Sequence, residues 1–186
     1  MNISEDEFLI LRAVAEEKMT SQRSFTLSTS FSLGKVNKLL NKLIEKDLIL
    51  YDSHLYSLTK LGKKVLSDYK VDNAIILAAG LSSRFVPISY DKPKALLVVD
   101  GLPLIEHIIL KLKEKNINTI YIVTGYKSEM FFYLRDKYNV NLVFNPEFNC
   151  KNTHASINVV KEHLSNTYIV CGDNYFKKNL FPQYEY

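Results

Sequence analysis

The chain has 186 residues, of which 47% are hydrophobic, and its 24 Lys and Arg against 20 Asp and Glu give a net charge of +4. This composition excludes a disordered chain, and the length allows one full domain or two small ones. No apolar run approaches the roughly 18 residues needed to span a membrane, and the acidic start is unlike a secretory signal. Cys150 and Cys171 have no metal-binding spacing, which is typical of a reduced, cytoplasmic protein.

The sequence changes character near residue 70, which predicts one domain over residues 1–70 and another over residues 71–186. In the first, a capping pair of Ser4 and Glu7 predicts a helix to about Lys18, and Thr20 opens a shorter one. A third helix begins after Ser32. Residues 48–58 read as two short strands around an Asp-Ser-His turn, and a last helix follows from residue 59. The predicted order is helix, helix, helix, hairpin, helix.

This order, with Ser32-Leu-Gly-Lys-Val-Asn-Lys-Leu-Leu and the later Tyr56-Ser-Leu-Thr-Lys-Leu-Gly, resembles the winged helix-turn-helix of MarR-like regulators over residues 4–67. In that family the third helix enters the major groove of DNA, and the hairpin wing reaches the neighbouring backbone. The resemblance therefore implies DNA as a partner of the first domain.

A lysine stripe on the third helix agrees with that expectation. At about 100° per residue, the lysines from Lys35 to Lys46 fall within an arc of roughly 80° beside the apolar face, where they can meet phosphates. The two asparagines on this helix can read adenine edges. The candidate DNA-binding residues are Lys35, Asn37, Lys38, Asn41 and Lys42. Alternatively, the lysines only solvate an amphipathic helix. The wing lacks Arg and Lys between Tyr51 and Tyr56, and a winged helix can also serve as a protein-docking or dimerising module.

The second domain opens with the apolar run Asn-Ala-Ile-Ile-Leu-Ala-Ala-Gly, residues 73–80, which predicts a buried parallel strand. The small residues after it would let backbone N–H groups face an anion. Arg84 can fork onto a phosphate, and Lys94 adds a second positive charge. Pro87 and Pro93 stiffen the connection between them.

This loop resembles the phosphate-binding loop of the sugar-phosphate and choline-phosphate nucleotidyltransferases: Leu-Ala-Ala-Gly, a small pair, Arg, two residues, Pro, and then Pro-Lys. The resemblance covers residues 73–181. It implies that the loop wraps a nucleoside triphosphate, that Arg84 and Lys94 are catalytic through the phosphates, and that the acceptor's own phosphate attacks. The nucleotide-binding residues it implies in the loop are Ala78, Ala79, Gly80, Ser82, Ser83, Arg84 and Lys94. Many members have glycine where this chain has Ser82. The alternative interpretation is an ordinary turn between a strand and a helix.

Strands and helices alternate through the rest of the domain. Helices are predicted at 101–115, 128–138 and 156–164, and strands at 119–124, 141–144 and 168–173. This alternation predicts an α/β Rossmann-like parallel sheet that binds ligands at the carboxyl ends of its strands. Gly80, Gly125 and Asp173 would then share one rim, with Gly125 a further nucleotide-binding residue.

Asp173 resembles the metal-binding aspartate of the same family. In-line attack on a triphosphate calls for Mg²⁺ to gather its charges, so the expected cofactor is Mg²⁺. An Asp at a strand end can instead be a turn or cap residue.

Residues 145–156 resemble the corresponding stretch of the choline-phosphate cytidylyltransferase branch, which implies CTP and phosphocholine rather than another nucleoside triphosphate and a sugar phosphate. Asn152 and Ser156 match a loop there that contacts nucleotide or acceptor. Either side chain can equally be a helix cap.

Related enzymes continue past residue 186 and carry a second metal-binding aspartate, for which only Glu185 remains here. Two hypotheses follow. The chain is either a cytidylyltransferase represented by its first part, inactive in this form if the second aspartate is essential, or a DNA-binding regulator whose incomplete second half senses a nucleotide. The open sheet edge predicts a homodimer.

Overall fold

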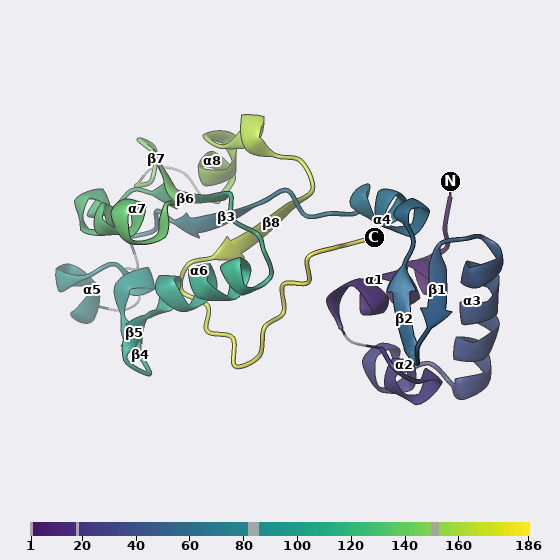
Figure 1. The fold of residues 1–186 in the computed structure, drawn as a ribbon. Coiled ribbons are helices and arrows are strands. Elements are labelled where there is room, and N and C mark those ends of the chain that lie inside the picture. The colour runs from purple at the N-terminus through teal and green to yellow at the C-terminus, as the bar shows by residue number, and fades with distance from the viewer. Residues whose placement is uncertain (1, 18, 82–85, 150–152) are drawn as a thin grey trace. The chain divides into compact units, whose positions relative to one another are not determined.

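A computed structural model describes residues 2–17, 19–81, 86–149 and 153–186. The chain divides into two compact units (Figure 1). The first comprises residues 1–70 together with 184–186, and the second comprises residues 71–183. The division falls at residue 70, and the last three residues belong to the first unit.

The first unit contains four helices and a hairpin among its described residues, in the predicted order (Figure 1). These elements are α1 (Glu5–Glu16), α2 (Gln22–Thr29), α3 (Leu33–Glu45), β1 (Ile49–Asp52), β2 (Leu55–Leu58) and α4 (Lys60–Ser67). A hydroxyl caps each helix by accepting a backbone N–H of its first turn. The caps are Ser4, Ser21, Ser32 and Thr59. The second helix therefore begins two residues later than its predicted opening at Thr20.

The apolar face of α3 packs into the core of the first unit. Val36, Leu39, Leu40 and Leu43 are buried, as their spacing predicts, but Ile44 is 42% exposed. In the hairpin, Ile49 pairs with Leu58 and Asp52 with Leu55. The predicted turn is thus a two-residue connection, and Ser53 and His54 both adopt positive φ there.

The last residues of the chain complete the first unit. The ring of Tyr186 stacks on Tyr69 with centroids 5.4 Å apart, and its hydroxyl donates to the Ile3 carbonyl over 3.3 Å. The Glu185 N–H donates to the Tyr69 carbonyl over 2.8 Å. Within the second unit, the Val71 N–H donates to the Gln183 carbonyl over 2.9 Å, so the two ends of that unit lie side by side.

The second unit is built on a parallel four-stranded sheet in the order β7-β6-β3-β8, which confirms the predicted parallel α/β fold. The strands are β3 (Asn73–Ala78), β6 (Ile120–Thr124), β7 (Asn141–Phe144) and β8 (Thr167–Cys171). Alternate residues of β3 enter different cores. Ile76 joins the large cluster that includes helix α6 (Leu104–Glu114), whereas Ile75 packs with Val160 in a smaller one. Both faces of β3 are therefore covered.

Several elements differ from the predicted ones. Leu102–Pro103 form a short strand, β5, paired with β4 (Val98–Val99), so α6 starts after Pro103. The predicted helix 128–138 is a 3-10 turn, η3 (Ser128–Phe131), followed by α7 (Tyr133–Tyr138). The predicted helix 156–164 is α8 (Thr153–Asn158) and then η4 (Lys161–His163). The short helices α5 (Ile88–Asp91) and η2 (Lys94–Leu96) lie between β3 and β4. No helix in the described ranges has the length and apolarity to cross a bilayer.

Candidate functional site

The sheet register brings the predicted site residues to one rim. Ala78 of β3 pairs with Thr124 of β6, and Leu77 pairs with Cys171 of β8. The strands run parallel, so the segments that follow them emerge at the same edge. Gly80 follows β3, Gly125 follows β6 and Asp173 follows β8. These three residues therefore lie at one edge of the sheet, as the sequence predicts; this edge is called the rim below.

Lys94 and Asp173 form an ion pair on this rim. The Lys94 Nζ donates to Asp173 Oδ2 over 2.6 Å, and the two side chains are 29% and 34% exposed. Asp173 lies in the turn after β8, and Lys94 opens η2. The two predicted charged residues are thus direct partners, although the sequence spacing gives no sign of it.

Gly172 allows the close packing that joins these segments. Its N–H donates to the Leu77 carbonyl over 2.8 Å. A Cβ on Gly172 would lie 3.2 Å from the Cβ atoms of Ala78 and Ala95 and from the Leu77 oxygen. The end of β8 is therefore held tightly against the end of β3 and against η2, the element that carries Lys94.

Gly125 has a packing role at the end of β6. A Cβ there would lie 2.4 Å from the Phe148 Cβ and 2.7 Å from the Ala79 oxygen. The following residue, Tyr126, donates its N–H to the same Ala79 oxygen over 3.2 Å. The absence of a side chain at Gly125 thus lets the segments after β3, β6 and β7 approach one another.

Ser156, predicted as a nucleotide contact, faces the protein interior. Its hydroxyl accepts a hydrogen bond from the Asn145 Nδ2 over 3.1 Å, and both residues are buried. The Asn145 Oδ1 accepts the Glu147 N–H over 3.0 Å, and its own N–H donates to the Thr124 carbonyl over 2.8 Å. Asn145 therefore ties β6, β7 and α8 together, a role that its Asn-Pro sequence context did not reveal.

The remaining predicted nucleotide contacts divide into three groups. Ala78 and Ala79 are buried, at 8% and 4% exposure, so only their backbone is available to a ligand. Gly80 is exposed, and no atom of the described residues lies within 4 Å of the position its Cβ would take. The predictions for Ser82, Ser83, Arg84 and Asn152 lie outside the described residues.

Lys127 is a rim residue that sequence reasoning did not select. Its Nζ donates to the Tyr90 carbonyl over 2.5 Å and to the Asp91 carbonyl over 3.1 Å. It thereby connects the turn after β6 to α5, in the segment between β3 and β4. The sequence Gly-Tyr-Lys after the strand marks a turn at this position, but it does not indicate that the lysine would contact α5.

Asp173 is the residue predicted to bind Mg²⁺, and its surroundings show which other ligands the protein provides. Within the described ranges, no group of three or more His, Cys, Asp or Glu side chains is placed to hold a metal ion. Proteins hold Mg²⁺ through one or two carboxylates, with waters and substrate phosphates as the other oxygen ligands. A single, partly exposed carboxylate such as Asp173 therefore fits a metal shared with a nucleotide.

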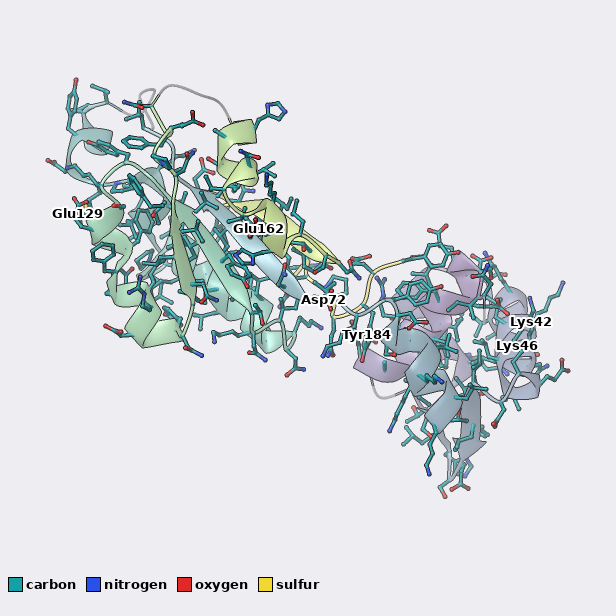
Figure 2. All side chains as sticks on the ribbon, turned by 90° about the horizontal axis from the view of Figure 1, so that it is seen from above. Lys42, Lys46, Asp72, Glu129, Glu162 and Tyr184 are labelled. Carbon is teal, nitrogen blue, oxygen red and sulfur yellow. The ribbon has the colours of Figure 1, made fainter. Side chains whose placement is uncertain are left out.

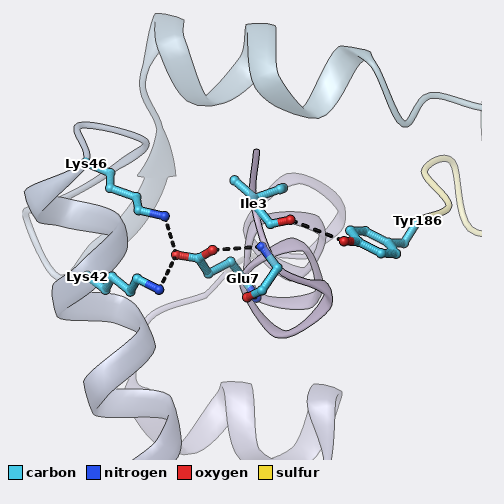
Figure 3. A network of polar contacts seen from close by, with 6 residues as sticks. Ile3, Glu7, Lys42, Lys46 and Tyr186 are labelled. Atoms are coloured by element: carbon cyan, nitrogen blue, oxygen red, sulfur yellow. Dashed lines mark hydrogen bonds and ion pairs between the residues drawn. The ribbon is translucent and has the colours of Figure 1, made fainter. Parts of the chain in front are cut away.

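In the first unit, helix α1 neutralises much of the lysine stripe on α3. Lys35 pairs with Asp6 over 2.7 Å. Lys42 and Lys46, which project from α3 (Figure 2), reach the Glu7 Oε1 over 3.2 and 2.6 Å. Figure 3 shows both lysines converging on Glu7, whose other oxygen accepts the Ser4 N–H.

These contacts change the acidity of Glu7, whose side chain is 2% exposed. Burial alone would raise its pKa, but the hydrogen bonds from Lys46, from the Ser4 backbone and from Lys42 outweigh burial and lower the pKa from 4.5 to about 2. Glu7 is therefore a carboxylate at neutral pH, and part of the positive charge of Lys42 and Lys46 is compensated within the unit.

The other candidate DNA-binding residues are exposed on α3. The Asn41 Nδ2 donates to the Asn37 Oδ1 over 2.9 Å, and the Asn37 Nδ2 lies 3.4 Å from the Gln22 Oε1. Lys38 is exposed on the same helix. The asparagine amides thus hydrogen-bond to one another and to α2 in the structure.

Comparison with known families agrees with the fold of the second unit. The MobA-like NTP transferase domain matches residues 74–180, more than half of the chain. The chain therefore belongs to this family of nucleotidyltransferases.

Individual relatives are similar over stretches of about the same length. A choline-phosphate cytidylyltransferase from Streptococcus pneumoniae is 51% identical over 108 residues, which are 58% of this chain and 47% of the relative. One from Haemophilus influenzae is 38% identical over 109 residues, covering 59% and 47%. A solved structure of the CTP:phosphocholine cytidylyltransferase from Streptococcus pneumoniae matches with a TM-score of 0.59 at 50% identity, covering 60% of this chain and 49% of that one. The chain thus spans about half the length of these relatives.

Proposed function

We propose that this chain carries the nucleotide-binding part of a CTP:phosphocholine cytidylyltransferase, which makes CDP-choline and releases pyrophosphate. The observation that carries the proposal is the 51% identity to a choline-phosphate cytidylyltransferase over 108 residues. A 2-aminoethylphosphonate cytidylyltransferase from Lancefieldella rimae, 42% identical over 92 residues, which are 49% of this chain and 37% of the relative, also supports a cytidylyl transfer.

In the proposed reaction, a phosphate oxygen of phosphocholine attacks the α-phosphorus of CTP. A new P–O–P linkage forms while the bond to the β-phosphate breaks, and pyrophosphate leaves. The attacking phosphate is already ionised, so no general base is required. The backbone from Ala78 to Gly80, the Ser82–Ser83 pair and Gly125 would border the triphosphate, with Arg84 and Lys94 stabilising its charge. Asn152 and Ser156 would shape the loop beside the nucleotide.

Asp173 would hold Mg²⁺ together with the phosphates. When bound, Mg²⁺ supplies charge neutralisation for the pyrophosphate leaving group. We place this reaction in the cytoplasm, where CTP is made.

Pyrophosphate release tests the proposal. The full chain is incubated with Mg²⁺, each of four nucleoside triphosphates, and phosphocholine, 2-aminoethylphosphonate or glucose-1-phosphate. We expect the highest turnover with CTP and phosphocholine, and a loss of about 100-fold in Lys94→Met because a phosphate-stabilising charge is removed. Turnover only with a sugar phosphate would contradict the choice of acceptor, and unchanged turnover in Lys94→Met would contradict the role of Lys94.

We propose as a second function that the first unit is a MarR-like winged helix-turn-helix that binds DNA. The order of α1 to α4 around the β1–β2 hairpin supports it, as does the exposure of Asn37, Lys38 and Asn41 on α3. Lys35 and Lys42 would contribute less, because each is paired with an α1 carboxylate.

A gel-shift titration with promoter DNA from the gene's own neighbourhood tests this second function. We expect Lys38→Glu to weaken binding at least tenfold, because it reverses a phosphate-facing charge. The matched control is Lys64→Glu on α4, which changes the net charge equally. Equal losses in both variants, or no binding by the wild-type chain at low salt, would contradict the proposal. If pyrophosphate release is also absent while DNA binding persists, the nucleotide-sensing regulator is supported over the enzyme.

We also propose a homodimer. Strand β8 lies at the edge of the sheet, and Ile169 on it is 46% exposed. Such an edge can pair with a second copy. Sedimentation velocity should show a dimer that Ile169→Lys dissociates; a wild-type monomer at micromolar concentration would contradict it.

A further inference from the structure

The ion pair of Lys94 and Asp173 has a consequence for the order of ligand binding, and this inference rests on the proposed function. The ammonium and the carboxylate are 2.6 Å apart. Both belong to the charged groups expected to hold the metal–triphosphate complex. In the structure each of these two charges has the other as a partner.

The backbone around the pair brings its two residues together. Gly172, directly before Asp173, is hydrogen-bonded to β3, and a Cβ added to it would lie 3.2 Å from the Cβ of Ala95, directly after Lys94. Because these neighbours are held in the unit's packing, the pair forms without rearrangement of either segment. Its partial exposure, 29% and 34%, leaves room for a ligand to reach both groups.

A divalent cation alone would bind poorly to such an arrangement. No cluster of three His, Cys, Asp or Glu ligands supports Asp173 in the described part of the chain. An entering cation would also meet the Lys94 ammonium a few ångströms away, and like charges at that distance repel. A metal that arrives with a triphosphate offers Lys94 new oxygen partners, so the repulsion is replaced by attraction.

We propose that Lys94 acts as a resident cation that blocks Asp173 to free metal and releases it when a nucleoside triphosphate binds. Metal and nucleotide then bind with positive coupling, and each strengthens the binding of the other by the same factor. Lys94 thus has two opposite effects on ligands, since it hinders the metal alone and helps the metal–nucleotide complex.

The substitution Lys94→Met separates these effects. It keeps most of the side-chain length and removes the charge. We expect Mn²⁺ alone to bind about tenfold more tightly to Lys94→Met than to the wild-type chain. We expect CTP, in the presence of Mn²⁺, to bind at least tenfold more weakly. A residue that only holds phosphate would produce the second change without the first.

Electron paramagnetic resonance of Mn²⁺ measures the free ion directly and needs no turnover. The titration uses the full chain as wild type, Lys94→Met, Lys94→Met with Asp173→Asn, and Lys92→Met as the matched control two residues away. We expect the gain in Mn²⁺ affinity in Lys94→Met, its loss in the double variant, and no change in Lys92→Met.

Two results would overturn the inference. One is unchanged or weaker Mn²⁺ binding to Lys94→Met, and the other is a gain that persists in the double variant. Either would leave the proposed function standing, provided that the wild-type chain still releases pyrophosphate from CTP. Failure of the proposed function would appear separately, as absence of that release.

Discussion

At the scale of single residues, two glycines on the rim have opposite surroundings. Among the described residues, none comes within 4 Å of where a Gly80 side chain would project, whereas Gly125 has two neighbours there closer than 3 Å. One position is free for a ligand to approach, and the other is needed for the protein's own packing. Substitution by alanine should therefore separate binding from folding at these two sites.

We predict that Gly80→Ala leaves the melting temperature unchanged and weakens CTP binding about tenfold, because a methyl group would occupy space expected for phosphate. Gly125→Ala should instead lower stability by about 1–3 kcal/mol, the usual effect of overpacking. Calorimetric titration with CTP and thermal unfolding by circular dichroism measure the two effects. Normal CTP affinity in Gly80→Ala would show that the loop does not approach the phosphates there.

Glu7 gives a prediction about pH. Its pKa is 4.5 when exposed and about 2 in the folded protein. Since the folded value is the lower one, the stabilisation is fully present above pH 4.5 and is lost as the pH falls toward 2. The shift corresponds to about 3 kcal/mol. Glu7→Gln should therefore destabilise the first unit by about that amount at pH 7 and by about half as much at pH 3.

Urea unfolding followed by circular dichroism at the two pH values measures this difference. The control is Glu5→Gln, an exposed carboxylate in the same helical turn. A destabilisation by Glu7→Gln that is equally large at pH 3 would mean that the amide disturbs packing rather than removing the ion pairs with Lys42 and Lys46.

The sequence could identify charged residues but not their partners. Lys94 and Asp173 each followed from a motif, whereas their mutual ion pair depends on the packing of Gly172 against Ala95. The lysine stripe on α3 followed from helical spacing, whereas its neutralisation comes from α1, about 30 residues earlier in the chain. Contacts of this kind depend on tertiary structure, so periodicity carries no record of them.

At the scale of elements, strong local patterns predicted well and weak ones did not. Strands β3, β6 and β7 lie where apolar runs between polar segments placed them. The β4–β5 pair was not predicted, because a strand of two residues is too short to show the alternation of apolar and polar side chains. The predicted helix 156–164 begins instead at Thr153 and breaks after Asn158, where Val159 and Val160 turn into a core.

The C-terminal segment provides a prediction at this scale. Tyr186 stacks on Tyr69 and lies 5.6 Å from Phe8, centroid to centroid. We predict that Tyr186→Ala loosens the segment, because ring contacts of this kind contribute about 1 kcal/mol. Hydrogen exchange of the Glu185 amide, which donates to the Tyr69 carbonyl, should accelerate about fivefold. Tyr186→Phe retains the ring and should exchange nearly as the wild type; equal acceleration in both variants would assign the effect to the hydroxyl bond with Ile3.

At the scale of the whole molecule, both the parallel sheet and the family could be predicted from the sequence. The sheet follows from the alternation of strands and helices, and the family follows from a motif whose residues from Leu77 to Lys94 all match in type and spacing. The winged helix-turn-helix remains a prediction, since it rests on element order and a lysine pattern rather than on a motif with its own chemistry. The nucleotide and acceptor depend on branch-level similarity, and the reaction assay decides them.

The hydrogen bond between Val71 and Gln183 has a consequence for the first unit. Closing a flexible loop of roughly 110 residues costs about 4 kcal/mol in chain entropy. The packing of the folded second unit offsets this loss of chain entropy, because the fold already holds the two ends of the unit together. Residues 184–186 are then presented to Tyr69 at a high effective concentration, as by a short tether. Unfolding of the nucleotide-binding unit would dilute this segment, and any ligand that keeps the unit folded would maintain it.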